Sequence, residues 1–249
     1  MMNKVVLVTG GAKGIGRAIA LELAKQGYDI VINYLTSQKE AEALQKEIKE
    51  MYGVRCMAIP CDVSKEDEVD KMISCIEEKL GGVDILINNA AVDLSNLFHL
   101  KTAEEFRRTM EVNVVGAFNC SKRVYRYMLE KEYGRIINIS STNGINTYYP
   151  MCIDYDASKA ALISLTHNLA FEFAPYIHVN CIAPGFIGTE NELDGYDEEF
   201  LREEIEKIMV QRYGDPKEVA YLVKFLISEE ADFINNTIIR IDGGQKGSC

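Results

Sequence analysis

Histidine is scarce in this chain of 249 residues, and its cysteines are scattered. The histidines at positions 99, 167 and 178 share no ligand spacing, and the seven cysteines include no C-x-x-C pair. A zinc centre therefore has little support, and we expect no bound metal. An odd number of cysteines in a chain without an export signal is typical of reduced thiols that pack as small apolar groups.

Long apolar runs are missing too. None approaches the ~18 residues that indicate a membrane span. The first residues, Met-Met-Asn-Lys, lead straight into an apolar segment, which leaves no room for a signal peptide. We therefore expect a cytoplasmic protein without a membrane partner.

Basic side chains are outnumbered in this sequence. The 27 lysines and arginines against 38 aspartates and glutamates give a net charge of −11, which argues against nucleic acid as a partner. A hydrophobic content of 47% with 26% charged residues is ordinary for a soluble globular protein. The length is sufficient for a full core.

Apolar segments rich in β-formers alternate with amphipathic helical patterns along the chain. The predicted strands are 4–9, 29–33, 54–60, 83–88, 134–140, 177–183 and 237–241. The predicted helices are 14–26, 38–51, 65–80, 102–130, 155–174 and 215–229. Such alternation, with near-continuous apolar strands, indicates a parallel sheet covered by helices on both faces. No linker rich in Pro, Gly or Ser divides the chain, so we predict a single α/β domain over residues 1–249.

Segment 185–211 breaks this rhythm. It begins at Gly185, contains an acidic helical pattern and follows the C-terminal end of a predicted strand. Ligands of parallel sheets bind at that end of the strands. We therefore predict that this segment is a substrate lid.

A glycine-rich turn connects the first strand to the first helix. It reads Thr9-Gly10-Gly11-Ala12-Lys13-Gly14-Ile15-Gly16. Gly10 permits a tight turn, while Gly14, Ile15 and Gly16 open a helix whose amide groups would meet a pyrophosphate. A glycine-rich turn alone is a weak signal. Its position between a strand and a helix, at the start of an α/β chain, indicates a dinucleotide site.

Three Y-x-x-x-K matches compete for a proton-transfer role: Tyr127–Lys131, Tyr155–Lys159 and Tyr213–Lys217. Only Tyr155 follows a Ser-Ser strand end and, before that, a helix that carries an asparagine. The sequence context therefore favours Tyr155 and Lys159.

A tyrosine can exchange a proton with the oxygen of an alcohol or ketone, although free tyrosine titrates near ~10. Lys159 lies one helical turn beyond Tyr155 on the same face, and we expect it to lower the pKa of the phenol. Ser141 would hydrogen-bond the substrate oxygen, with Ser140 as its rival. A dinucleotide site together with this phenol indicates hydride transfer between a nicotinamide and a carbonyl or alcohol carbon.

These landmarks resemble the short-chain dehydrogenase/reductase family. The resemblance follows the family's order over nearly the whole chain and rests on Thr9–Gly16, Asp62-Val63, Asn88-Asn89-Ala90-Ala91, Asn113, Ser141, Tyr155, Lys159, Pro184-Gly185 with Thr189, and Ile241-Asp242-Gly243-Gly244. It implies a single Rossmann-like, doubly wound domain with a seven-stranded parallel sheet. It also implies a homotetramer or homodimer.

The same resemblance assigns roles to individual residues. The cofactor contacts that it implies are Asp62 and Val63 at the adenine, Asn89 and Ala90 at the central part, Pro184, Gly185, Ile187 and Thr189 towards the nicotinamide carboxamide, and Tyr155 with Lys159 at the ribose and reacting end. It places Asn113 on a water-linked proton path with Lys159. From the residues alone, an asparagine in an apolar helical stretch is more often a structural hydrogen-bonder, and the two roles can coexist.

The end of the second strand bears on the choice of cofactor. A carboxylate there would hydrogen-bond the ribose and repel a 2′-phosphate, whereas this chain has Asn33-Tyr34. Lys13 can reach the phosphate as a point charge. Both observations favour NADP(H) over NAD(H), although the arginine that the family often places after this strand is missing.

The substrate is the least determined part of the prediction. The overall resemblance is closest to 3-oxoacyl-[acyl-carrier-protein] reductases, but Glu132 and Tyr176 stand where those enzymes use arginines to dock an acidic carrier. Like charges would also repel such a carrier. The apolar and aromatic loop 143–153 suits a ring system. We therefore predict a free small molecule, such as a hydroxysteroid or bile acid, with the carrier-protein substrate as the alternative and a non-enzymatic dinucleotide-binding or redox-sensing protein as a further one.

Overall fold

The computed structural model describes residues 3–195 and 197–247. Its strands form one seven-stranded parallel sheet in the order β3-β2-β1-β4-β5-β6-β7. The strands are β1 (Val5–Val8), β2 (Asp29–Tyr34), β3 (Cys56–Pro60), β4 (Ile85–Asn88), β5 (Gly134–Ile139), β6 (Ile177–Pro184) and β7 (Ile238–Ile241). The predicted doubly wound fold is confirmed.

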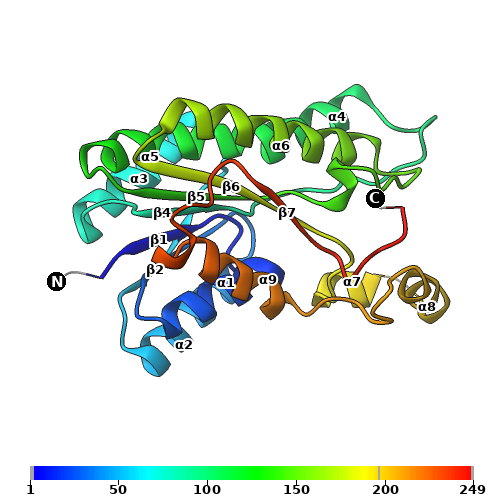
Figure 1. The fold of residues 1–249 in the computed structure, drawn as a ribbon, viewed down its shortest axis with the longest axis horizontal. Coiled ribbons are helices and arrows are strands. Elements are labelled where there is room, and N and C mark those ends of the chain that lie inside the picture. The colour runs from blue at the N-terminus through cyan, green and yellow to red at the C-terminus, as the bar shows by residue number, and fades with distance from the viewer. Residues whose placement is uncertain (1–2, 196, 248–249) are drawn as a thin grey trace.

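Helices cover both faces of the sheet (Figure 1). The α-helices are α1 (Gly14–Lys25), α2 (Gln38–Tyr52), α3 (Glu66–Leu80), α4 (Ala103–Met110), α5 (Gly116–Glu130), α6 (Ile153–Phe173), α7 (Glu190–Gly195), α8 (Glu198–Glu206) and α9 (Pro216–Leu226). Shorter elements are the π-helical segment η1 (Glu111–Val115) and the 3₁₀ turns η2 (Thr142–Gly144) and η3 (Glu229–Ala231). In Figure 1, α1, α2 and α9 lie on one side of the sheet, and α3, α5 and α6 lie on the other.

The alternation of side chains along each strand builds two apolar cores. Successive strand residues point to opposite faces. Val6 and Val8 accordingly pack with the residues of α1 and α9, whereas Val5 and Leu7 pack with the residues of α3 and α5. Both faces are buried, which explains why the central strands read as continuous apolar runs rather than as alternating ones.

The predicted helix over 102–130 is divided in the structure. α4 begins after Thr102, whose side chain accepts a hydrogen bond from Glu105 N in a capping box. The helical path then widens into η1 before α5 begins at Gly116. A Cβ atom at Gly116 would lie 2.6 Å from Cγ2 of Val63, so the glycine allows α5 to approach the loop after β3 closely. Short π segments of this kind occur often at functional sites.

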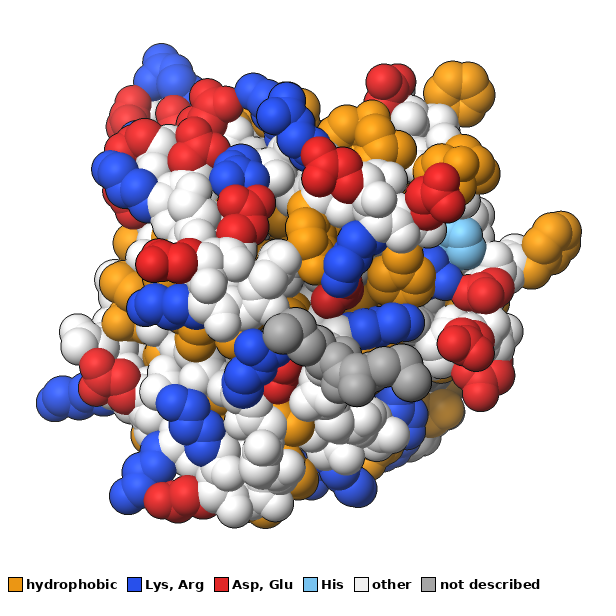
Figure 2. All heavy atoms as spheres, turned by 90° about the vertical axis from the view of Figure 1, so that its left-hand side faces the viewer, with side chains coloured by type: hydrophobic (Ala, Val, Ile, Leu, Met, Phe, Trp, Pro, Cys, Tyr) orange, Lys and Arg blue, Asp and Glu red, His pale blue; other side chains and the backbone are white. Residues whose placement is uncertain are grey.

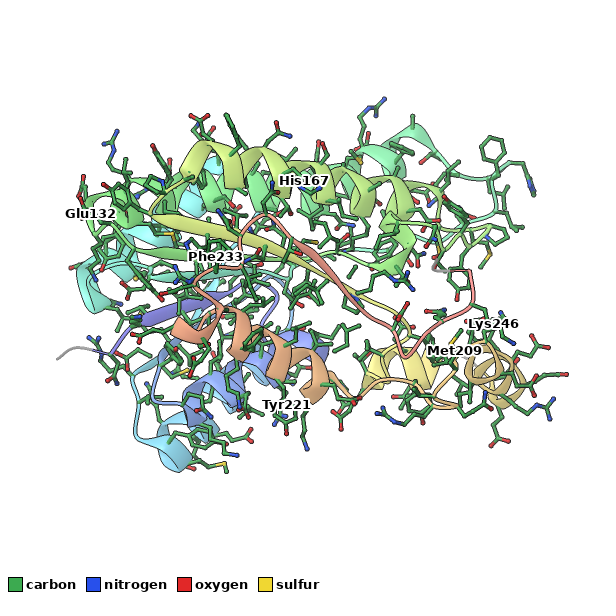
Figure 3. All side chains as sticks on the ribbon, in the orientation of Figure 1. Glu132, His167, Met209, Tyr221, Phe233 and Lys246 are labelled. Atoms are coloured by element: carbon green, nitrogen blue, oxygen red, sulfur yellow. The ribbon has the colours of Figure 1, made fainter. Side chains whose placement is uncertain are left out.

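Segment 185–211 forms α7 and α8 beyond one end of the sheet, next to the C-terminal tail (Figure 1). The tail runs beside the stretch that follows α8: Met209 N donates to Gly244 O at 3.3 Å, and Lys246 N donates to Lys207 O at 2.8 Å. Figure 3 shows Met209 and Lys246 on this side of the molecule. Across residues 3–195 and 197–247, no helix has the length and apolar character that a membrane crossing requires.

Candidate active site

The glycine-rich turn lies between β1 and α1 and approaches the backbone after β4. Gly10 has φ +59°, and a Cβ atom there would lie 2.9 Å from Cα of Ala90. A Cβ atom at Gly16 would lie 2.5 Å from the carbonyl oxygen of Gly10. Lys13 at the N-cap position of α1 makes no side-chain hydrogen bond to the first turn. The amide groups that open α1 are therefore left to an anion such as a pyrophosphate, so the turn fits a dinucleotide.

Thr9 and Asn89 fix this turn against the end of β4. The Thr9 hydroxyl accepts hydrogen bonds from the backbone amides of Asn89 at 2.9 Å and Ala90 at 3.0 Å. The Asn89 side-chain amide donates to Thr9 O at 2.9 Å and to Gly10 O at 3.1 Å. Asn89 and Ala90 thus lie at the turn, as predicted for cofactor contacts. Sequence reasoning assigned no role to the Thr9 side chain, although its position directly before the first glycine was the available signal.

A cavity of about 230 Å³ opens beside the turn, and its size suits the adenine end of the cofactor. Its lining includes Gly10, Lys13, Asn33, Asp62, Val63, Ala90 and Arg108. The Asp62 carboxylate accepts hydrogen bonds from Ser64 and from Arg108 Nη2, the latter at 2.9 Å. Burial raises the pKa of Asp62, but the bonds from Ser64 and Arg108 outweigh it and leave the pKa below its usual value. Arg108 went unrecognised because it lies 46 residues from Asp62 in the sequence.

Asn33 and Lys13 both border this cavity, yet both have protein partners. The buried Asn33 side chain accepts a hydrogen bond from Gly10 N at 3.2 Å and donates to Cys61 O at 3.0 Å. The Asn33 side chain therefore connects the glycine turn to the residue that follows β3. The Lys13 ammonium lies 2.7 Å from Glu40 Oε1 on α2, and both side chains are about half exposed. A 2′-phosphate would have to compete with Glu40 for Lys13.

Ser141, Tyr155 and Lys159 come together where β5 ends and α6 begins. The side chains of Ser141 and Tyr155 share a hydrogen bond. The Lys159 ammonium lies 5.2 Å from the centroid of the Tyr155 ring and donates to Ile139 O at 2.9 Å. Ser140 is buried and donates to Lys159 O at 2.8 Å. Ser140 thus supports the backbone of α6, and Ser141 is the serine beside the phenol.

The environment of Tyr155 keeps its phenol protonated. Burial raises the pKa of Tyr155, the carboxylates of Asp93 and Glu192 raise it further, and the bond with Ser141 lowers it only in part. Burial also lowers the pKa of Lys159 to about 8. The expected net lowering of the Tyr155 pKa is not found in this arrangement, because burial, first of all, and the charges of two carboxylates raise it. The site therefore holds a proton donor suited to the oxygen of a ketone.

Asn113 lies in η1, between the two halves of the divided helix. Its side chain accepts a hydrogen bond from Val92 N at 2.8 Å and donates to Val92 O at 3.0 Å and to Ser158 Oγ at 2.9 Å. Among the described residues, these bonds connect the loop after β4 to α6 and do not include Lys159. The structural role is thus present, and the proton path stays a prediction.

The segment after β6 lies against the glycine turn from the opposite side. A Cβ atom at Gly14 would lie 3.3 Å from Cγ2 of Thr189, which places Thr189 directly beside the start of α1. Pro184 ends β6, and Ile187 is buried. A Cβ atom at Gly185 would lie 2.6 Å from Asp242. Of the four residues predicted to reach towards the nicotinamide, Thr189 is therefore the one that lies against Gly14.

The apolar wall expected on the substrate side stays a prediction. Tyr148 is 74% exposed and Met151 is 44% exposed. The hydroxyl of Tyr149 donates to the buried carboxylate of Glu204 on α8 at 2.6 Å. The carboxylates of Asp93 and Glu192 act on Tyr155 electrostatically.

A dinucleotide-binding turn and a tyrosine acid together define an NAD(P)-dependent oxidoreductase that acts on CH–OH groups. The family described as short chain dehydrogenase matches residues 4–199. The chain belongs to the short-chain dehydrogenase/reductase family.

Relatives of known function agree on this chemistry. The chain is 39% identical to the 3-oxoacyl-[acyl-carrier-protein] reductase of Staphylococcus epidermidis over 98% of this chain and 99% of the relative. It is 39% identical to the acetoacetyl-CoA reductase of Rhizobium meliloti over 98% and 99%. Among solved structures, acetoin dehydrogenase from Salmonella typhimurium superposes with a TM-score of 0.88 at 35% identity, covering 98% of this chain and 96% of that one. A short-chain dehydrogenase/reductase of Serratia marcescens reaches a TM-score of 0.91 at 31% identity over 98% of both chains.

Proposed function

We propose that this enzyme reduces the 3-oxo group of a 3-oxoacyl thioester to a secondary alcohol, with NADPH as the electron donor. The observation that carries the proposal is the hydrogen bond between Ser141 and Tyr155, with the buried Lys159 next to the Tyr155 ring. These residues lie at the same end of the sheet as the dinucleotide turn. Two relatives at 39% identity act on thioesters of this class by name. These names favour the thioester and do not support the hydroxysteroid expected from the sequence.

The residues divide the work of the reaction among them. The glycine turn and Thr189 would hold the dinucleotide, which would supply or accept a hydride when bound. Ser141 hydrogen-bonds the substrate oxygen and orients the carbonyl. Tyr155, kept protonated by its surroundings, donates its proton to the developing alkoxide. Lys159, whose ammonium lies 5.2 Å from the centroid of the Tyr155 ring, would replace that proton.

The proposed preference for NADP(H) rests on the cavity beside β2. Its lining at the end of β2 consists of Tyr34, Leu35, Thr36 and Ser37, none of which has a carboxylate, and the Asp62 carboxylate of the same cavity follows β3 instead. Lys13 lines it too and supplies a positive charge. The ion pair of Lys13 with Glu40 opposes this preference, so we expect a moderate discrimination rather than an absolute one.

The second candidate substrate is a small uncharged ketone that is not attached to a carrier. Asp93 and Glu192 raise the pKa of Tyr155, so the same carboxylates would repel an anionic group next to the reacting carbonyl. The structural similarity to an acetoin dehydrogenase supports this candidate. The same catalytic residues would act on this ketone and on the thioester, and the two substrates differ only in the part of the molecule that does not react.

We further propose that segment 185–211 closes over the substrate, that the chain assembles as a homotetramer or homodimer, and that it works in the cytoplasm. The lid rests on the position of α7 and α8 beside the tail. The assembly rests on apolar side chains left in solvent, among them Phe171 at 86% exposure and the fully exposed Phe233. The location rests on the free thiols of Cys56, Cys61, Cys75, Cys120, Cys152 and Cys181.

A substrate panel tests the proposed function. Acetoacetyl-CoA, a 3-oxoacyl pantetheine thioester, acetoin and a 3-oxosteroid are each offered with NADPH and with NADH. The thioesters should give the highest kcat/KM, and Tyr155→Phe should lower kcat by a factor on the order of 10² or more while NADPH affinity stays nearly unchanged. Preferred turnover of acetoin would select the second candidate, and near-normal turnover by Tyr155→Phe would remove Tyr155 from the mechanism.

A further inference from the structure

A buried ion pair joins the loop after β4 to the first turn of the catalytic helix. Lys101 Nζ lies 2.8 Å from Asp154 Oδ1, and the exposed fractions of the two side chains are 5% and 0%. Asp154 directly precedes Tyr155 in α6. The second oxygen of Asp154 accepts a hydrogen bond from the Thr109 hydroxyl of α4 at 2.7 Å. One carboxylate therefore connects α4, the loop 89–102 and the start of α6.

The same lysine also holds the backbone of its own loop. Lys101 Nζ donates to the carbonyl of Leu94 as well as to Asp154. Two further contacts join this loop to the residues before Tyr155: Asn96 N donates to Met151 O at 3.1 Å, and Ser95 Oγ lies 3.3 Å from Cys152 Sγ. The loop follows the C-terminal end of a parallel strand, where substrates bind. It also carries Asp93, one of the carboxylates that act on Tyr155.

Charge is an expensive way to connect two segments. Removing an ammonium and a carboxylate from water costs free energy, and their mutual attraction offsets this cost only when the geometry is good. A pair of apolar side chains would often connect the two segments with equal stability. An ion pair differs from apolar packing because its hydrogen bonds form only when the two segments are aligned in one relative position. Burial raises the pKa of Asp154, yet the bonds from Lys101 and Thr109 keep it below its usual value, so the carboxylate is charged and depends on those partners.

We propose that Lys101 is a positioning residue for the reaction. Through its ion pair with Asp154, Lys101 fixes the position of the first turn of α6 relative to the loop 89–102, which would form the opposite side of the substrate site. The Tyr155 hydroxyl is positioned together with this turn. Lys101 does not touch the reacting atoms. This inference rests on the proposed role of Tyr155 but not on the identity of the ketone.

Substitution at both ends of the pair tests this role. Lys101→Met keeps the length of the side chain and leaves Asp154 without its cation, so the pKa of Asp154 should rise. The variant should lose kcat by about tenfold or more, since small misplacements of a reacting group are costly. The loss should grow as the pH rises and Asp154 ionises. Lys101→Met combined with Asp154→Asn removes that ionisable group, and the additional pH dependence should disappear. Lys101→Arg keeps the charge and should recover much of the kcat.

Two controls separate positioning from folding and from the choice of substrate. Lys71→Met breaks an exposed ion pair with Asp67 on α3 and should leave kcat unchanged. Hydrogen exchange and NADPH binding need no substrate: in Lys101→Met, the amides of Asn96 and Leu97 should exchange faster while NADPH affinity is retained. If Lys101→Met does not fold, Asp154→Asn alone is measured in the same way. An unchanged kcat with unchanged exchange at these amides overturns the proposal, as does a pH dependence that persists in the double variant.

Discussion

Lys159 is the residue of the active site whose pKa burial shifts towards neutral pH. Burial lowers its pKa to about 8, whereas burial and nearby carboxylates hold the pKa of Tyr155 above its ordinary value. Below about pH 8 the lysine carries a proton that can replace the one given up by Tyr155. Above that pH the neutral amine can take one up.

The two directions of the reaction should therefore respond to pH in opposite ways. The kcat/KM for ketone reduction should fall as the pH rises through about 8, and that for alcohol oxidation should increase over the same interval. Initial rates in both directions between pH 6 and 10 measure this, with roughly tenfold change per pH unit at the limit. In Lys159→Arg, whose guanidinium stays protonated, the change near that pH should vanish from the residual activity. If the change in rate near that pH persists in Lys159→Arg, it belongs to the titration of another group.

Glu40 sets how much of the Lys13 charge is available to the cofactor. The two side chains form an ion pair on the edge of the adenine cavity. Glu40→Gln should therefore tighten NADPH binding relative to NADH by roughly two- to fivefold, the range of an exposed pair. Lys13→Ala should weaken NADPH more than NADH. Fluorescence titration at fixed salt measures both affinities.

The control for these variants is Glu50→Gln, which changes the net charge equally on the same helix, α2, where Glu50 pairs with Lys46. It should leave the NADPH to NADH ratio unchanged. An equal effect of Glu40→Gln and Glu50→Gln would show that the preference for NADPH depends on the total charge of the protein. A wild-type chain that binds NADH more tightly than NADPH would contradict the proposed preference for NADPH.

A polar contact connects helix α8 to the loop that precedes the catalytic helix. The Tyr149 hydroxyl donates to Glu204, which is 1% exposed and also pairs with Lys207. Gln245 of the tail donates to Tyr149 Oη at 3.4 Å. Three distant segments of the chain therefore meet at the Tyr149 hydroxyl, beside a buried carboxylate on the proposed lid.

Tyr149→Phe should loosen this element without unfolding the sheet. A hydrogen bond to a charged group contributes about 1.5–3 kcal/mol, so the amides of α8 should exchange faster with solvent, and the KM for the ketone should rise several-fold. The matched control is Tyr148→Phe, because the side chain of Tyr148 is 74% exposed. Equal exchange in the two variants would show that the contact with Glu204 does not hold α8.

The charge of the whole molecule bears on whether a carrier protein can deliver the substrate. The net charge is −11, yet acidic and basic side chains are mixed over the face shown in Figure 2. Glu132 lies at this end of the molecule, away from Met209 and Lys246 (Figure 3). On this face, repulsion of an acidic carrier would therefore arise from the total charge and from Glu132 rather than from one acidic patch.

An acidic carrier should accordingly gain little over a small thioester. We expect the kcat/KM with 3-oxoacyl carrier protein to exceed that with the pantetheine thioester by less than about tenfold, because steering requires opposite charge. Raising the salt concentration should leave the carrier reaction unchanged or slightly faster, since screening removes repulsion. The pantetheine thioester, measured at the same salt concentrations, is the control. A large carrier advantage that collapses with salt would show instead that local basic groups outweigh the net charge.

The sequence by itself determined the fold and the local parts of the site. Strand periodicity and glycine spacing act over a few residues, so the β1–Gly10–α1 turn and the pair of Tyr155 and Lys159 on one helix could be predicted from neighbours along the chain. The position of Ser141 at the end of β5 followed in the same way. These features depend on backbone geometry that the local sequence fixes.

Only the tertiary structure decided which polar groups meet across the fold. Arg108 reaches Asp62 over 46 residues, Lys101 reaches Asp154 over 53, and Tyr149 reaches Glu204 over 55. The tertiary structure also decided that the pKa of Tyr155 rises, because burial and the carboxylates of Asp93 and Glu192 act through space. The physical reason is common to all of these: the partner of a charged side chain and its loss of water are set by packing, and spacing along the chain carries no record of either.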